Sequence, residues 1–446
     1  MLELRFSKII RNTSRRLMQM NTKVKTSKEV KIKKVRTKML NQDKQEMKDF
    51  FPLMIAVAFA YLSFGAITNV AGAIIPKIRD TYQVSSSLSS LLAATFFIAY
   101  GLTSIPWGIF MDKNSKKTTL IVSSLITTGG VALFAAISGF VPNMVAMFLC
   151  GVGITGVQVA INPLVSEISD PAKYSRNLTL FMVVNGAGGY LAPQLVTLIK
   201  NQGMAWSVTY WVFTAIALIM TLAISFPQYP QATKAEKKSD KTKSNHTLDL
   251  LTKHPLIYLY AVGIFLYVGV EVGVANTIGF YLQDKLNIGE LLGAGAEAAK
   301  NTAISNYWGG LLLGRLVGSV VLDRIPGKVA IMTYISLAAG ALYLATHGDI
   351  NQALWAFPAI GFFISIMFPT IYSIATNSFP KEYSSAISGI LCTAIIGGAV
   401  VGPAIATVAE LSQGSNTVPN WDTGLLIAFA CYAYIFCIGV FAKEEK

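Results

Sequence analysis

The stretch "YLYAVGIFLYVGVEVGVANTIGFYL", from Tyr258 to Leu282, decides the fold, because its twenty-five residues carry a single charge, the glutamate Glu271. An apolar run of about 20 residues is long enough to cross the roughly 30 Å hydrocarbon core of a bilayer as a helix. The whole chain shares this character, since 53% of its 446 residues are hydrophobic and 13% are charged. Soluble globular proteins carry about 25% charged residues. We therefore expect a membrane protein, in which Glu271 needs an explanation of its own.

Twelve apolar runs of this kind occur along the chain. They are continuous rather than alternating, which favours membrane-spanning helices over the strands of a closed barrel. The sequence therefore predicts an all-α membrane protein with twelve transmembrane helices. The runs lie near residues 50–76, 87–111, 118–140, 142–165, 177–199, 206–226, 255–282, 300–322, 329–347, 352–377, 385–411 and 423–442.

The spans divide six and six around a polar, lysine-rich segment, and similar strings recur in the same order on both sides of it. "YLSFGAITNVAGAIIP" from Tyr61 matches "YVGVEVGVANTIGFYL" from Tyr267, with Gly65 opposite Glu271. "PAKYS" matches "PKEYS", and "GAGGYLAP" matches "GGAVVGP". Parallel repeats of this type place a substrate site between the two halves, near the middle of the bilayer. The predicted domains are a basic tail at 1–49, a six-helix bundle at 50–226, a linker at 227–254 and a second six-helix bundle at 255–446.

The loop charges predict the orientation. If the N-terminus is cytoplasmic, the cytoplasmic loops after the first span hold 16 Lys and Arg residues, and the opposite loops hold 5. By the positive-inside rule, both termini lie in the cytoplasm of a multi-pass protein of the plasma (inner) membrane. The tail carries 15 Lys and Arg residues and 5 acidic ones. Three interpretations stay open for it: a disordered arm near anionic headgroups, a start site upstream of the true one, or an organelle presequence.

Polar side chains within the spans predict a binding site. Thr155, Gln158 and Asn162 are spaced three and four residues apart, so they share one face of the fourth span. Amides in lipid need partners, which neighbouring helices or a hydroxylated ligand in a central cavity can provide. Tyr267 and Trp308 either stack on the apolar face of a sugar or pack between helices. The predicted substrate-binding residues are Asn69, Gln158, Asn162, Asn185, Tyr267, Glu271, Asn276, Asn306 and Trp308.

Glu271 admits three interpretations. An ionised carboxylate at this depth must be protonated, paired or exposed to water. Arg315 is the other charge placed deep in a span, so a structural pair between them is one interpretation. The second is a ligand for sugar hydroxyls or a cation, and the third is a proton-binding site. Arg315 lies towards the cytoplasmic end of its span, which is typical of a gate or latch residue.

Two loops resemble the cytoplasmic signature of the major facilitator superfamily. They are "GIFMDKNSKK" from Gly108 and "GSVVLDRIPGK" from Gly318, although Ser115 replaces a glycine that is usual in that signature. The resemblance implies a latch that closes the inner side of the transporter; alternatively, the lysines are positive-inside anchors. The predicted latch residues are Asp112, Lys113, Lys116, Lys117, Arg315, Asp323 and Arg324.

Further strings narrow the resemblance. "GITGVQVAINP", "FLYVGVEV", "YWGGLLLGRLVGS", "GFFISIMFPTIYS" and "SGILCTAIIGGAVVGP" are similar to the fucose, glucose and galactose permease family, especially its glucose/galactose branch. This resemblance implies sugar uptake driven by an ion gradient, with a proton or sodium as the co-transported ion. The family's aspartate in the first span corresponds to Gly72 here, and the glutamate of its fucose branch corresponds to Gln158. We therefore expect weaker proton dependence than the family implies.

Other classes of protein fit the sequence less well. His246, His254 and His347 lie in loops or at a span end, and the four cysteines show no metal-binding spacing, so we expect no enzyme, no catalytic residue, no cofactor and no metal site. Scattered amides do not line a continuous channel, and no folded module for nucleic acid accompanies the basic tail. The alternatives that remain are a transporter of another small polar or cationic solute and a membrane sugar sensor. We expect a monomer in the lipid bilayer.

Overall fold

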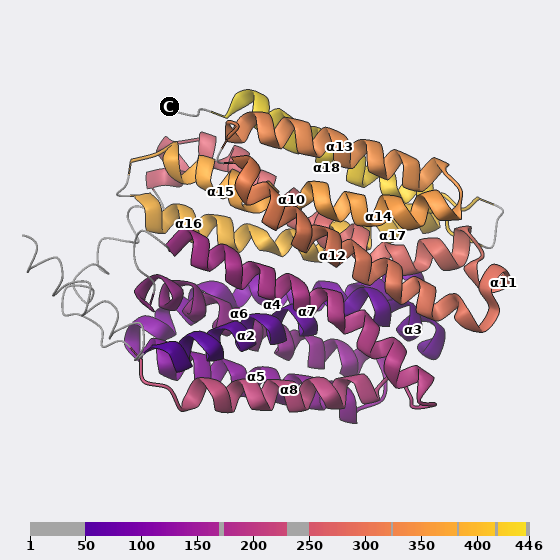
Figure 1. Ribbon diagram of the computed structural model, residues 1–446, viewed down its shortest axis with the longest axis horizontal. Coiled ribbons are helices and arrows are strands. Elements are labelled where there is room, and N and C mark those ends of the chain that lie inside the picture. The colour runs from indigo at the N-terminus through magenta and orange to yellow at the C-terminus, as the bar shows by residue number, and fades with distance from the viewer. Residues whose placement is uncertain are drawn as a thin grey trace, which may run out of the picture. The chain divides into compact units, whose positions relative to one another are not determined.

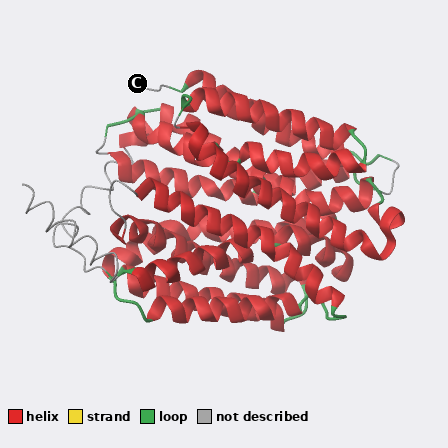
Figure 2. Cartoon of the chain, in the orientation of Figure 1, coloured by secondary structure: helices red, strands yellow, loops and turns green. Residues whose placement is uncertain are grey.

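The structure is a computed structural model that describes residues 50–168, 174–229, 249–322, 324–380, 383–414 and 418–442. Within these ranges the chain forms helices joined by short loops, without strands (Figures 1 and 2). Residues 54–446 form one compact unit, separate from residues 1–53. The predicted tail at 1–49 lies outside the described residues, as does most of the predicted linker at 227–254.

The first half of the chain forms six spans. The first consists of two helices, which are separated at Val70. The elements are α2 (Phe51–Asn69), α3 (Ala71–Tyr82), α4 (Ser86–Lys113), α5 (Lys116–Ala136), α6 (Phe140–Ile168), α7 (Tyr174–Asn201) and α8 (Val208–Ser225).

The second half forms six more spans, and three of them are interrupted. The seventh span continues into a π-helical turn, the tenth breaks into two helices, and the eleventh contains a 3₁₀ segment. The elements are α10 (Leu256–Phe280), η2 (Tyr281–Lys285), α11 (Ile288–Leu292), η3 (Gly293–Gly295), α12 (Ala296–Leu322), α13 (Gly327–His347), α14 (Ile350–Ile364), α15 (Met367–Asn377), α16 (Ser384–Thr393), η5 (Ala394–Ala399), α17 (Val401–Leu411) and α18 (Trp421–Phe441).

The prediction of twelve membrane-spanning helices is confirmed. Eleven helical segments among the described residues are long and apolar enough to cross a membrane. The twelfth is α12, which has the length but is less apolar because it carries Glu297, Lys300 and Arg315. Large apolar side chains such as Leu102 and Leu313 are exposed on the outside of the helices, as expected for surfaces that face lipid.

The halves lie side by side, with the first half in the lower part of Figure 1 and the second in the upper part. Their main contacts join α7 to α12, α4 to η5 and α17, and α3 to α10. We call the end where α8 finishes and α10 begins the linker end. The opposite end, where α3 finishes and α11 lies, is the far end (right in Figure 1).

Both halves use glycine in the same way to bring helices together. A Cβ on Gly65 of α2 would lie 1.9 Å from the backbone oxygen of Asn185 on α7. In the second half, a Cβ on Gly397 of η5 would lie 1.8 Å from the backbone oxygen of Phe265 on α10. Only a residue without a Cβ permits such backbone contact between membrane helices. The first and fifth spans therefore pack like the seventh and eleventh, as expected for two repeats.

Candidate functional site

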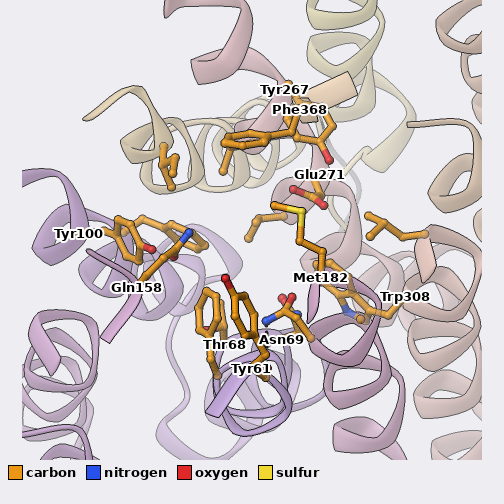
Figure 3. A pocket seen from close by; sticks show the side chains of 18 of the residues that line it. Tyr61, Thr68, Asn69, Tyr100, Gln158, Met182, Tyr267, Glu271, Trp308 and Phe368 are labelled. Atoms are coloured by element: carbon orange, nitrogen blue, oxygen red, sulfur yellow. Dashed lines mark hydrogen bonds between the residues drawn. The ribbon is translucent and has the colours of Figure 1, made fainter. Parts of the chain in front are cut away.

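A cavity lies between the two halves, midway along the helices. It is lined by residues of α2, α4, α6 and α7 from the first half and of α10, α12, α15 and η5 from the second (Figure 3). Its volume is about 130 Å³. One water needs about 10–15 Å³ by this measure, so the cavity has room for roughly ten waters, or for one small polar solute.

Several hydrogen-bonding groups in the cavity have no partner among the residues that the structure describes. The hydroxyl of Tyr100 and the indole N–H of Trp308 are buried and unpaired among the described residues, as is the hydroxyl of Thr68. The side chains of Asn69 and Gln158 also line the cavity and make no hydrogen bond to a described residue. Buried polar groups are normally satisfied by protein, water or ligand. The cavity therefore offers a set of uncharged donors and acceptors to a bound molecule.

Aromatic rings supply the apolar part of the wall. Figure 3 shows Tyr61 of α2 and Tyr267 of α10 on opposite sides of the cavity, with Phe368 beside Tyr267. Tyr61 stacks on Phe181 with ring centroids 5.5 Å apart, and the centroids of Tyr267 and Phe368 are 6.3 Å apart. These contacts hold the rings in the cavity wall, where they form an apolar surface for a ligand.

One ion pair lies in the wall. Arg315 Nη2 is 3.5 Å from Glu271 Oε1, and these are the two charged side chains that line the cavity within the described part of the chain. Arg315 Nη1 also donates to the backbone oxygen of Met182 on α7, at 3.4 Å. The hydroxyl of Tyr307 donates to the backbone oxygen of Glu271 at 2.7 Å. Glu271 is therefore both paired and part of the cavity, and the guanidinium links α10 and α12 to α7 across the two halves.

Six of the nine predicted binding residues line the cavity. They are Asn69, Gln158, Asn185, Tyr267, Glu271 and Trp308. Asn185 also donates from Nδ2 to the backbone oxygen of Tyr61, at 3.2 Å, so part of its side chain holds α7 against α2. The side chain of Asn162 lies outside the described residues.

Two predicted residues do not line the cavity, and helix geometry explains both. Asn306 lies two residues before Trp308 on α12, which at about 100° per residue turns it to nearly the opposite face. Asn276 lies one turn beyond Val272 on α10, towards the far end. There α3 packs against α10 and closes the space between the halves.

Three polar lining residues, Tyr61, Thr68 and Tyr100, were not predicted from the sequence. The internal repeat contained a signal for Tyr61, because that residue aligns with Tyr267, which we did predict. Thr68 lies seven residues after Tyr61, a spacing that places both on one face of α2. Nothing in the sequence distinguishes Tyr100 from a packing aromatic.

The far end is closed by ion pairs between the halves. Arg79 of α3 binds Asp284 of η2 through two nitrogens, at 2.7 and 3.1 Å. The indole N–H of Trp421 donates to Asp284 at 3.2 Å, and the Arg79 guanidinium lies 4.9 Å from the ring centre of Phe280. Further links join Lys77 and Lys200 to Glu297, and Ser87 to Glu410.

Gly72 permits this closure. A Cβ at this position would lie 2.9 Å from the backbone oxygen of Ala275 on α10, closer than real Cβ atoms approach. The backbones of α3 and α10 therefore touch on the far-end side of the cavity. A carboxylate at position 72 would not fit into this arrangement.

The predicted latch residues form no ion pair between the halves among the described residues. Lys116 pairs with Glu167 of α6, and Lys117 donates to the backbone oxygen of Pro227, so both contacts stay within the first half. Lys113 and Arg324 are exposed. Asp323 and the side chain of Asp112 lie outside the described residues. In the part of the chain that the structure describes, the ion pairs that join the halves lie at the far end.

Residues 53–403 match the model of the Major Facilitator Superfamily. The chain belongs to the Major Facilitator Superfamily. Its twelve spans and the cavity between two six-helix halves agree with that assignment.

Relatives of this superfamily member cover most of its length. It is 28% identical over 423 residues to a glucose/galactose transporter of Brucella abortus, a match that covers 91% of this chain and 98% of the relative. It is 30% identical over 411 residues to a putative glucose/galactose transporter of Helicobacter pylori, a match that covers 86% of this chain and 96% of the relative. The crystal structure of the Escherichia coli fucose:proton symporter superposes with a TM-score of 0.64 at 20% sequence identity. The match covers 89% of this chain and 100% of the symporter chain. That structural likeness supports the fold.

Proposed function

We propose that the protein transports a hexose-type sugar by alternating access, coupled to a cation gradient. The observation that carries this proposal is the cavity between the halves, in which uncharged hydrogen-bonding groups without a partner among the described residues lie among fixed aromatic rings. A sugar presents hydroxyls around its edge and an apolar face, which matches such a wall. The names of the Brucella and Helicobacter relatives support the same substrate class.

The ion pair favours a neutral substrate over a charged one. Because Arg315 neutralises Glu271, the cavity wall carries no net charge among the described residues. A cationic solute would have to compete with the guanidinium for the carboxylate. A neutral polyol needs no counter-charge from the wall and can bind through its uncharged hydrogen-bonding groups.

In this proposal, the bundles at 50–226 and 255–446 rock against each other as a monomer, and the linker end faces the cytoplasm of the plasma (inner) membrane. The excess of Lys and Arg in the loops at that end supports this orientation. The described conformation is then closed towards the outside by the far-end ion pairs. The latch at Asp112, Lys113, Lys116, Lys117, Asp323 and Arg324 acts in the opposite conformation, when the inner end closes.

Uptake into liposomes tests the function. The purified full chain is reconstituted, and entry of labelled glucose, galactose and fucose is compared with entry into protein-free liposomes. We expect at least one sugar to enter faster and an excess of the same unlabelled sugar to compete with it. Sugar binding without entry would show a sensor instead of a transporter, and the absence of both binding and entry across the panel would contradict the proposal.

The far-end ion pairs lead to a prediction about accessibility. An Arg79→Ala variant loses the bidentate pair, while Asp284 keeps its bond from Trp421. We expect the far end to open more often, by about fivefold, as corresponds to losing about 1 kcal/mol. The measurement is the labelling rate of a cysteine introduced at Gln283, using a membrane-impermeant maleimide.

The matched control for Arg79→Ala is Lys285→Ala. Lys285 pairs with Asp422, and both residues belong to the second half, so this change removes an ion pair without loosening the contact between the halves. Equal labelling rates in the two variants would mean that the Arg79 pair does not hold the far end closed.

A further inference from the structure

We propose that Glu271 is the proton-binding site of the transport cycle, and that the proton acts by releasing Arg315 to bind the sugar. This inference rests on the proposed function and names the coupled ion and its site. Among the described residues, Glu271 is the one carboxylate that lines the cavity. Its ion-pair partner Arg315 lines the cavity too.

The geometry connects protonation to substrate binding. With Glu271 ionised, Arg315 is held between the carboxylate on α10 and the backbone oxygen of Met182 on α7. A proton taken up from water at the open side converts the carboxylate into a neutral acid and ends the ion pair. The buried guanidinium then lacks a counter-charge and needs acceptors. Sugar hydroxyl oxygens in the same cavity are such acceptors, so proton binding raises the affinity for sugar.

By thermodynamic reciprocity, sugar binding must also favour proton uptake by the same factor. Loaded carriers therefore hold sugar and proton together, and empty carriers hold the ion pair. This relation is what a symporter needs in order to draw sugar in with a proton gradient. The missing acid at Gly72 predicts weak proton dependence only if coupling depends on that position.

A proton fits this site better than sodium. A sodium ion at Glu271 would lie next to the guanidinium, which is 3.5 Å from the carboxylate, and the two cations would repel each other. A proton removes the negative charge without adding a second cation beside Arg315.

Apart from Arg315 of α12, the described charged groups on the elements that pack against α10 lie at the far end. Among them, Arg79 of α3 pairs with Asp284, Glu410 of α17 accepts from Ser87, and Asp422 of α18 pairs with Lys285. The described residues of α14, α15, α16 and η5 carry no charged side chain. The remaining titratable groups near Glu271 are phenols, which ordinarily titrate near pH 10. They are Tyr61, Tyr100 and Tyr267 in the cavity wall, and Tyr307, whose hydroxyl donates to the backbone oxygen of Glu271.

The test measures proton uptake on sugar binding. The purified full chain in weakly buffered detergent solution is mixed with the sugar that it transports, and the pH change is recorded. We expect up to one proton to be taken up per bound sugar, and the sugar affinity to rise by about tenfold between pH 8 and pH 5.5, within the usual range of coupling between two sites. Sodium should not replace the proton.

Two variants locate the effect. Glu271→Gln resembles the protonated acid, so we expect sugar affinity that does not change with pH, no proton uptake and no accumulation against a gradient. Glu290→Gln makes the same chemical change on the exposed helix α11 and should behave like the unchanged protein. Thermal unfolding shows whether each variant is folded.

The outcomes separate this inference from the proposed function. If no sugar binds or enters, the proposed function fails. If sugar binds and enters but its affinity does not depend on pH, or if Glu271→Gln keeps the pH dependence, the assignment of Glu271 fails alone. Should Glu271→Gln not fold, the proton uptake of the unchanged protein still decides, because its absence would overturn the proposal.

Discussion

A Gly72→Leu variant is expected to lose nearly all transport while remaining folded. In the far-end-closed conformation, the position of a Cβ on Gly72 is only 2.9 Å from the backbone oxygen of Ala275, and backbone cannot move aside as a flexible side chain can. Overpacking costs about 1–3 kcal/mol, which corresponds to a 5- to 150-fold change in a population. This cost applies to the closed conformation alone, because α3 and α10 separate when the far end opens. Alternating access then stops in the outward-open state.

The measurements for this variant are initial sugar uptake and the labelling of a cysteine at Gln283. Uptake should fall about 5- to 150-fold, and labelling from the outside should become faster. Gly72→Ala, with a smaller side chain, should show uptake and labelling rates between those of the unchanged protein and those of Gly72→Leu. Gly129→Leu is the matched control, because a Cβ at Gly129 meets no atom within 4 Å. Normal uptake by Gly72→Leu would show that close contact at this position is not needed for the cycle.

Much of the fold follows from the sequence because membrane helices have a simple physical requirement. Each must place about 20 apolar residues in the hydrocarbon, so their positions follow from composition alone. The breaks within spans, such as the one at Val70 and the 3₁₀ segment η5, were not predicted. They depend on how neighbouring helices pack, which a single sequence does not show.

The candidate site was predictable by residue type but not by helix rotation. An amide in a membrane span is unusual enough to stand out, and Gln158 and Asn69 do line the cavity. Asn306 is equally unusual but lies on nearly the opposite face of α12 from Trp308. Tyr100 was missed because aromatic residues are common in apolar spans. The charges that close the far end, such as Arg79, were used only to predict the orientation in the membrane. Their ion pairs were not predicted, because the partners come from distant parts of the chain.

Gln158→Ala is expected to weaken sugar transport by about tenfold, seen as a rise in the sugar concentration that gives half-maximal uptake. Gln158 lines the cavity without a hydrogen bond to any described residue, so a bound sugar is the partner that its amide lacks. Losing two hydrogen bonds of about 0.5–1.5 kcal/mol each accounts for a change of this size. For the same reason the substitution should leave the thermal stability of the empty protein nearly unchanged. Asn306→Ala removes an amide that does not line the cavity and should transport normally. If the two variants transport equally well, Gln158 does not bind the substrate.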